Sequence, residues 1–268
     1  MKKYWHVINI GLQNNLAYRV NFLARTLFGL IPLTAMLMLW RTIYAGKGAD
    51  AQVGAYTLAQ MISYYLVVTV VSALTTVSED DWQIAADIRD GNINHFLAKP
   101  MDYLGYRLCL FFCGRIIYTV VAALPLAVFI WFLRDYVRGP TDASTLGWFA
   151  LSVVLTALLQ FFISYALAML AFWVLEVSTF IFIVYAFEYI ASGHLFPLDI
   201  LPVSLQRVLA FTPFPYELYF SVSIYMGKVS GPQLLQGLAV QAAWVLAAYG
   251  LAQWAWRRGI RHYAAAGG

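Results

Sequence analysis

Few residues of this chain carry chemically active side chains, and their spacing matches no catalytic motif. The 268 residues contain no G-x-x-x-x-G-K-[ST] phosphate-binding loop, no G-x-S-x-G nucleophile elbow and no H-E-x-x-H zinc motif. The histidines lie far apart, without the spacing of a metal site: His6, His95, His194 and His262. Cys109 and Cys113 share one face of an apolar segment and are expected to be packed thiols. We therefore expect no enzyme activity, no metal and no cofactor in this chain.

One acidic residue stands inside an apolar segment. An ionisable group in that setting is a functional candidate by default, and Glu188 has aromatic neighbours on both sides. If Glu188 faces a transport path, it favours cationic amphiphiles. Its place shortly before Gly193 also allows a pairing with a polar group near the outer interface. Gln160 and Gln241 are expected to form hydrogen bonds between helices.

The composition decides what kind of element must position these residues. Of all residues, 62% are hydrophobic and 11% are charged, whereas soluble domains have about 25% charged residues. This excludes a water-soluble enzyme and a disordered chain. The net charge of +4 is not gathered on one soluble face, so nucleic acid is not an expected partner. Lipid must surround most of the molecule.

Six segments are long and apolar enough to cross a bilayer, which takes about 20 residues. We predict transmembrane helices at 22–41, 55–77, 107–133, 146–174, 178–193 and 233–256. The fourth and fifth form one apolar tract that must turn near Glu176, because a single helix of that length would exceed the membrane. No linker separates a second domain, so residues 1–268 are expected to form a single all-α membrane domain.

The two ends of the chain are predicted to lie in the cytoplasm. Residues 1–21 have apolar side chains at helical spacing, which predicts an amphipathic helix in the inner interface, and 257–268 form a tail. The alternative for 1–21 is the polar start of the first span. Basic residues favour the cytoplasmic side. The inner set is Lys2, Lys3, Arg19, Arg25, Arg89, Lys99, Arg107, Arg115, Arg257, Arg258 and Arg261, against an outer set of Arg41, Lys47, Arg134, Arg138, Arg207 and Lys228.

The inner connection at 78–104 carries helix start and stop signals. Ser78 can cap a helix with acidic residues in its first turn, and Gly91 can end it. A second short apolar face follows and ends at Lys99–Pro100. An ordinary solvated loop is the simpler interpretation, but the length of the segment favours a docking element.

The outer connection at 194–230 is too apolar for a free loop and too rich in proline for a spanning helix. Broken helices are tolerated at membrane depth only when they pack against protein or line a cavity. We therefore predict a pair of short re-entrant helices, with an apolar loop lying on the outer leaflet as the alternative.

Together these features resemble the permeases of ABC-2 type transporters, which have the type V exporter fold. The resemblance covers the whole chain. It rests on D-I-R-x-G-x-I followed by L-x-K-P between spans two and three, and on S-G-x-x-F-P-x-x-x-L-P before span six. The chain looks closest to a bacterial branch that is often associated with drug or viologen export, in which the permease is separate from its ATPase.

The resemblance implies partners and roles. Two permease chains, identical or different, would form a dimer above two cytoplasmic ATPase subunits that hold ATP and Mg²⁺, in the bacterial cytoplasmic membrane. The ATPase-coupling residues would be Asp87, Ile88, Arg89, Gly91, Ile93, Leu97, Lys99 and Pro100. The outer gate would contain Ser192, Gly193, Phe196, Pro197, Leu201 and Pro202. The substrate path would be lined by Tyr64, Tyr65, Thr69, Phe180, Val184, Phe187 and Glu188.

The expected function is export of a hydrophobic or amphiphilic substrate along a path at the permease dimer interface. An ion-coupled carrier is the main alternative, although such carriers normally show related halves and more intramembrane charges. The other alternative is a membrane scaffold that only recruits an ATPase.

Overall fold

The computed structural model describes residues 2–46, 52–77, 80–97, 99–137, 139–140, 142–174 and 176–266. The predicted all-α class is confirmed, because these residues form helices and no β-strand beyond one isolated bridge. The α-helices are α1 (Lys2–Ala17), α2 (Arg19–Ala45), α3 (Leu58–Thr75), α4 (Asp80–Arg89), α5 (Ile93–Leu97), α6 (Tyr103–Phe132), α7 (Ala143–Ala168), α8 (Ser178–Ala191), α9 (Val203–Leu209), α10 (Phe214–Glu217), α11 (Tyr219–Tyr225) and α12 (Gly231–Ala266). Three 3-10 turns are η1 (Arg134–Tyr136), η2 (Met169–Phe172) and η3 (Leu198–Ile200).

Within this described part, five helices are long and apolar enough to cross a membrane: α2, α3, α6, α7 with η2, and α12. The fifth predicted span, 178–193, falls on α8, which has only 14 residues. At 1.5 Å per residue it reaches about 21 Å, less than the hydrocarbon core of about 30 Å. Alone, α8 is therefore too short to cross a bilayer along its axis.

Local signals set where the helices begin and end. Thr57 and Gln60 form a capping box that starts α3, and the Asp102 side chain accepts a hydrogen bond from Gly105 N at the start of α6. The proposed Ser78 cap lies outside the described residues. Several helices continue past the apolar segments predicted for them. The difference is largest for α12, which runs to Ala266, ten residues beyond the predicted span, because polar and charged residues sustain a helix outside the apolar core.

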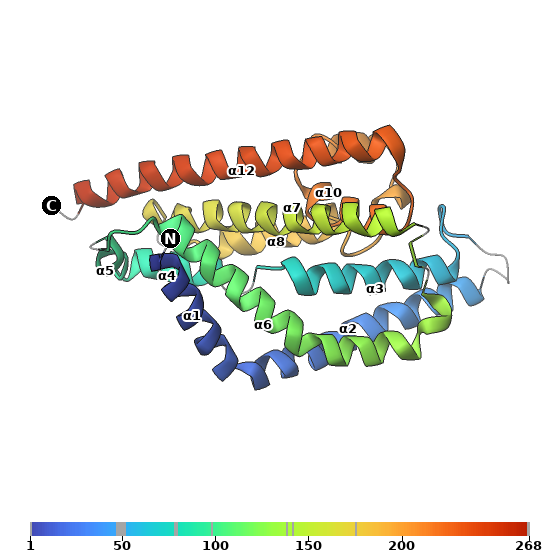
Figure 1. The fold of residues 1–268 in the computed structure, drawn as a ribbon. Coiled ribbons are helices and arrows are strands. Elements are labelled where there is room, and N and C mark those ends of the chain that lie inside the picture. Colours follow the sequence, from blue (N-terminus) through green and yellow to red (C-terminus); the bar gives the residue numbers. More distant parts are fainter. Residues whose placement is uncertain are drawn as a thin grey trace.

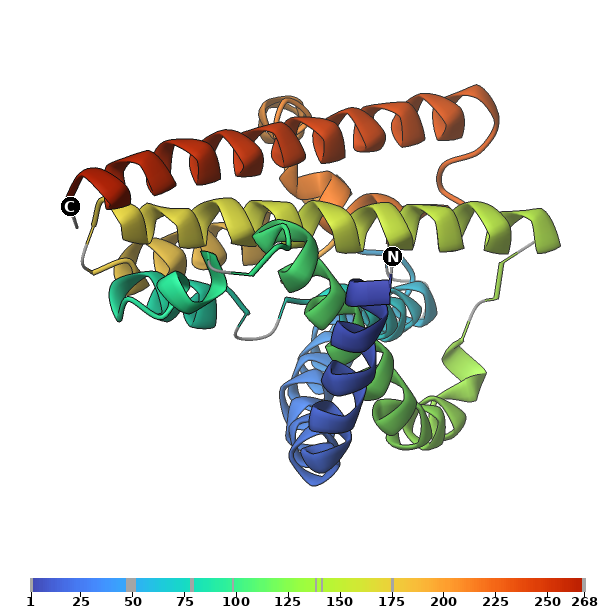
Figure 2. The same cartoon turned by 60° about the vertical axis from the view of Figure 1, so that its left-hand side comes forward.

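The molecule is built around α7. Helix α12 lies along α7 (Figures 1 and 2), and α11, α3 and α4 also pack against it. Gly237 and Gly259 of α12 let the rings of Phe220 and Phe172 come close, because a side chain at either position would overlap them. On the other side of the bundle, α1, α2 and part of α6 project away from α7 and α12 (Figure 2).

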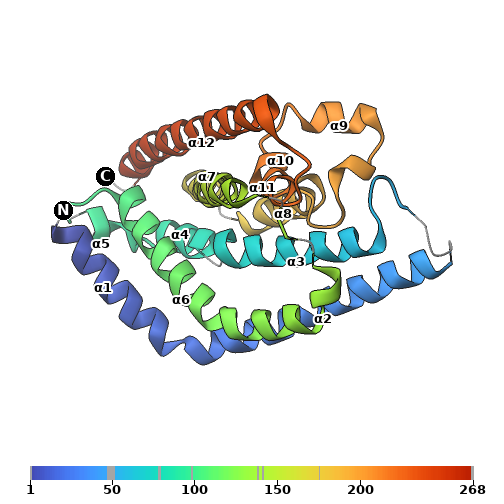
Figure 3. The ribbon, with the colours of Figure 1, turned by 45° about the vertical axis from the view of Figure 1, so that its right-hand side comes forward.

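The two ends of the bundle differ. Both termini and α4–α5 lie at one end, whereas η3, α9 and the segment before α3 lie toward the other (Figures 1 and 3). Helix α1 packs against α6, and Cys113 Sγ lies 3.5 Å from the Ile8 carbonyl oxygen that accepts its hydrogen bond. Trp5 and Leu16 of α1 stay exposed, and the interfacial position of this helix stays a prediction.

A fully buried amide joins α12, α7 and the segment that contains α10 and α11. Gln241 Nε2 donates to the Tyr216 and Ser152 carbonyl oxygens at 2.9 and 3.2 Å. Its Oε1 accepts from Ser152 Oγ at 2.9 Å. Since no water reaches these groups, each hydrogen bond also satisfies a buried polar atom that would otherwise lack a partner.

Replacing Gln241 by Leu is expected to lower the free energy of unfolding by about 2 kcal/mol, because it leaves buried partners unsatisfied. The measurement is thermal unfolding of the detergent-solubilised protein. Gln253→Leu is the matched control: it lies on the same helix, is only half-buried, and makes a single 3.4 Å bond to Tyr249 Oη. Equal melting temperatures for the two variants would contradict this role of Gln241.

Candidate functional site

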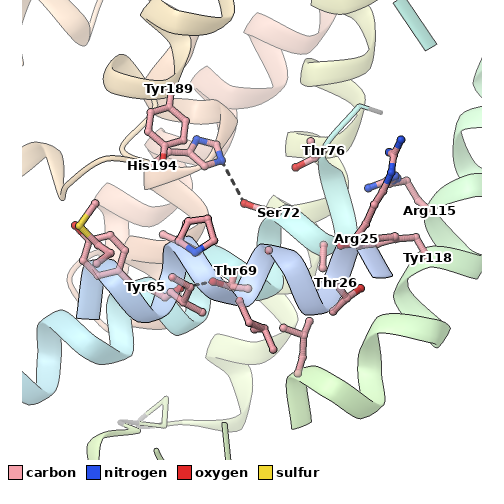
Figure 4. A pocket seen from close by; sticks show the side chains of 18 residues that line it. Arg25, Thr26, Tyr65, Thr69, Ser72, Thr76, Arg115, Tyr118, Tyr189 and His194 are labelled. Carbon is pink, nitrogen blue, oxygen red and sulfur yellow. Dashed lines mark hydrogen bonds between the residues drawn. The ribbon is translucent and has the colours of Figure 1, made fainter. Parts of the chain in front are cut away.

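A cavity of about 400 Å³ opens between α2, α3, α6 and the end of α8 (Figure 4). Its wall is mostly apolar, with scattered hydroxyl groups and two arginines. The lining includes Arg25, Thr26, Leu30, Leu33, Met36, Tyr65, Val68, Thr69, Ser72, Thr76, Arg115, Tyr118, Leu126, Tyr189 and His194. An apolar wall with a few polar groups suits an amphiphilic or hydrophobic ligand.

A second cavity of about 280 Å³ adjoins the first, since Thr76, Tyr189 and His194 line both. It extends between α7 and α8 and adds Gln160, Ser164, Tyr185 and Glu188 to the wall. The two cavities together follow α3 and α8 and bring residues far apart in sequence to one surface.

His194 stands where the cavities meet. Its Nε2 lies 3.2 Å from Ser72 Oγ (Figure 4), its Nδ1 lies 2.8 Å from Ser192 Oγ, and its ring stacks on Tyr189. The two hydrogen bonds and the stacking contact therefore fix the ring as a polar group in the wall.

The residues predicted for the substrate path fall in three places. Tyr65 and Thr69 line the first cavity and Glu188 lines the second. Tyr64 lines neither cavity: it is buried, and its hydroxyl donates to the Gly193 carbonyl oxygen. The remaining three lie on α8, where Phe180 and Phe187 are about half exposed on the outer face of the molecule and Val184 is half-buried.

The predicted gate residues belong to a folded insertion. The Ser192 carbonyl oxygen accepts a hydrogen bond from Tyr219 N at 3.0 Å, and Tyr65 Oη donates to the Leu195 carbonyl oxygen at 2.7 Å. Gly193 has a φ of +92°, and a Cβ there would lie 2.7 Å from Tyr64 Oη. This turn sends the chain back into the bundle.

The rest of the predicted gate continues that insertion. Phe196 is half-buried, Pro197 is buried and precedes η3, and Leu201 and Pro202 lead into α9. Lys228 Nζ lies 2.6 Å from Asp199 Oδ2 and ties η3 to the turn after α11. The insertion is thus held at both of its ends.

The predicted coupling residues divide into two sets. Ile88 and Ile93 are buried against the core, and Asp87 accepts a hydrogen bond from Tyr103 Oη and lies 3.7 Å from Arg107 Nη1. Gly91 takes a φ of +76° at the turn between α4 and α5. The other set points outward: Arg89, Leu97, Lys99 and Pro100 are exposed, together with Trp82.

An acidic residue that the sequence analysis missed lies beside Glu188. Glu217, at the end of α10, has no exposed surface, and its carboxyl meets that of Glu188. Both carboxyl oxygens of Glu217 are buried without a hydrogen-bond donor among the described residues. The available signal was that Glu217 is the one charged residue between Arg207 and Lys228.

Comparison with known proteins decides the family. A family model described as "ABC-2 family transporter protein" matches residues 30–267, which is most of the chain. The chain belongs to the ABC-2 transporter family. No curated protein and no solved structure gives a significant match.

Membership makes this ABC-2 chain the membrane permease of an ABC transporter, and its apolar helices make it a multi-pass membrane protein. The two cavities are therefore spaces inside a transporter subunit.

Replacing Gly193 by Ala in this permease is expected to lower its melting temperature markedly. The turn holds residue 193 in a left-handed backbone conformation, which costs an alanine about 1 to 2 kcal/mol. The turn also leaves no room for the Cβ of an alanine. Gly231→Ala is the matched control, since Gly231 also has positive φ but nothing within 4 Å of its Cβ position. Equal losses in the two variants would show that the contact with Tyr64 is not the constraint.

Proposed function

We propose that this permease exports a hydrophobic or amphiphilic substrate through the two joined cavities, driven by a separate ATPase subunit. The observation that carries the proposal is the mostly apolar wall that Tyr65, Thr69 and Leu33 form with other residues between α2, α3, α6 and α8. Its scattered hydroxyl groups suit an amphiphile better than a small ion.

The ATPase docks on α4 and α5. These helices lie at the end of the bundle that also holds both termini (Figure 1), which we place in the cytoplasm of a bacterial cell. Buried Ile88 and Ile93 fasten α4 and α5 to the core around α7, and exposed Trp82, Arg89 and Leu97 offer the contact surface. Force applied to this surface is therefore transmitted to α7. ATP and Mg²⁺ bind to the partner, not to this chain.

A second permease chain covers α8. Only Ile181 and Ala191 of α8 are buried, while Phe182, Ile183 and Ile190 are among its exposed apolar residues. Both a homodimer and a heterodimer are compatible with this surface. Residues of α8 line both cavities, so a partner on α8 would lie next to the path.

An ion-coupled carrier is the second candidate, and the Glu188–Glu217 pair is the observation that favours it. A scaffold that recruits an ATPase without transport has no specific observation in its favour. Transport that needs an ion gradient and no ATP would support the carrier.

Substitution of the exposed coupling residues tests the ATPase-driven reading of the site. In Arg89→Glu and Leu97→Asp, an ATPase that co-purifies with the wild-type chain in mild detergent is expected to be lost, with its activity, because hydrophobic contact and charge complementarity at the interface are removed. The measurement is a pull-down of the tagged chain from its host followed by an ATPase assay.

Arg134→Glu is the matched control, since this exposed arginine lies at the opposite end of the membrane domain. It should retain the ATPase. If no ATPase accompanies the folded wild-type chain, or if all three variants retain it equally, the proposed docking surface is wrong.

A further inference from the structure

Two carboxyl groups meet inside the membrane domain where α8 approaches α10. Glu217 is fully buried, and Glu188 lines the smaller cavity. Neither carboxyl oxygen of Glu217 has a hydrogen-bond donor among the described residues, and the group its carboxyl approaches is that of Glu188. Two carboxyl groups can bond to each other only through a proton.

The surroundings disfavour two negative charges. No Lys or Arg lines the smaller cavity, whose described titratable groups besides Glu188 are Tyr185, Tyr189 and His194. On the other packed elements, α10 contributes Tyr216, and α7 contributes the uncharged Gln160 and Ser164. The two arginines that line the adjoining cavity, Arg25 and Arg115, belong to the wall of the larger one. Two adjacent carboxylates in such a place repel each other strongly.

The pair also joins two parts that are fastened to the core to different extents. Helix α10 is fastened to the core, because the Glu217 carbonyl oxygen accepts from Gln160 Nε2 at 2.9 Å and the Tyr216 carbonyl oxygen accepts from Gln241 Nε2. Helix α8 packs lightly: it touches α7 and α10 at few points, and among its polar ties is Ser164 Oγ to Tyr185 Oη at 2.9 Å. The approach of Glu188 to Glu217 is thus one of the ties between α8 and the core.

We propose that Glu188 and Glu217 form a proton-binding site, in which one shared proton holds α8 against α10 and its departure lets α8 move. The proton leaves Glu217 or Glu188 for water in the smaller cavity, two carboxylates remain, and their repulsion separates the helices. Rebinding of a proton restores the contact. This goes beyond the proposed export function and requires neither a known substrate nor a known ATPase.

Infrared spectroscopy of the full-length chain in lipid nanodiscs tests the shared proton. The wild type should show a protonated-carboxyl C=O band at neutral pH that disappears as the pH rises. Glu217→Gln should lose this band, because the amide can donate to an ionised Glu188. Glu176→Gln, which removes an exposed glutamate at the α7–α8 turn, should keep it. A band that is absent from the wild type, or that persists in Glu217→Gln, would overturn the proposal.

Distance measurement between spin labels tests the movement. Labels at Ala186 of α8 and Val208 of α9, both exposed, are placed in a chain whose two cysteines are replaced. The distance should lengthen or broaden at alkaline pH in the wild type. It should stay constant in Glu217→Gln and, as a second variant, in Glu188→Gln, since each removes one of the repelling charges. The proposal would be overturned if the distance in the wild type did not change with pH. It would also be overturned if the distance in both variants changed with pH as much as in the wild type.

Discussion

The structure depends on one constraint: a chain that turns back inside a membrane domain must satisfy its own polar groups, because lipid offers no hydrogen bonds. Residues 192–225 do this with partners from the long helices. Tyr64 and Tyr65 of α3 donate to the carbonyl oxygens of Gly193 and Leu195. Gln160 of α7 and Gln241 of α12 do the same for Glu217 and Tyr216. These four side chains satisfy carbonyl groups of the broken segment that would otherwise lack a donor.

This constraint divides the permease into a firmly held part and a lightly held one. Helices α7, α10 and α12 share the Gln241 hydrogen bonds, and α11 and α4 pack on α7. Helix α8 and the outer face of α2 have few buried residues. Both cavities lie at the boundary between the two parts, so a modest displacement of α8 or α2 changes their shape. A transporter needs its path at such a boundary, since the path must open and close.

Much of the architecture follows from the sequence, because apolar length and turn residues act locally. Five apolar helices long enough to span a membrane and the shorter apolar helix α8 could be recognised in the chain itself, as could the break between α7 and α8. What the sequence does not contain is which side of a short helix faces the protein. Ile88 and Arg89 are neighbours in one motif, yet one is buried and the other exposed.

The candidate site was harder to predict than the fold for the same reason. Tyr64 and Tyr65 are adjacent, but only Tyr65 lines a cavity. Glu188 was recognisable as an ionisable residue in an apolar segment, whereas its partner Glu217 is 29 positions further along and meets it only after the insertion has folded back. Contacts of this kind arise from tertiary packing, which periodicity and composition do not encode.

The central claim is that the joined cavities are the path of an ATP-driven permease. It is tested most directly by the accessibility of a cysteine at Thr69, in a chain whose Cys109 and Cys113 are replaced, reconstituted with its ATPase. The account predicts that a membrane-impermeant thiol reagent labels this position from one side of the membrane without ATP, and that ATP shifts labelling to the other side or closes the position. Labelling that is the same from both sides and unaffected by ATP would contradict it.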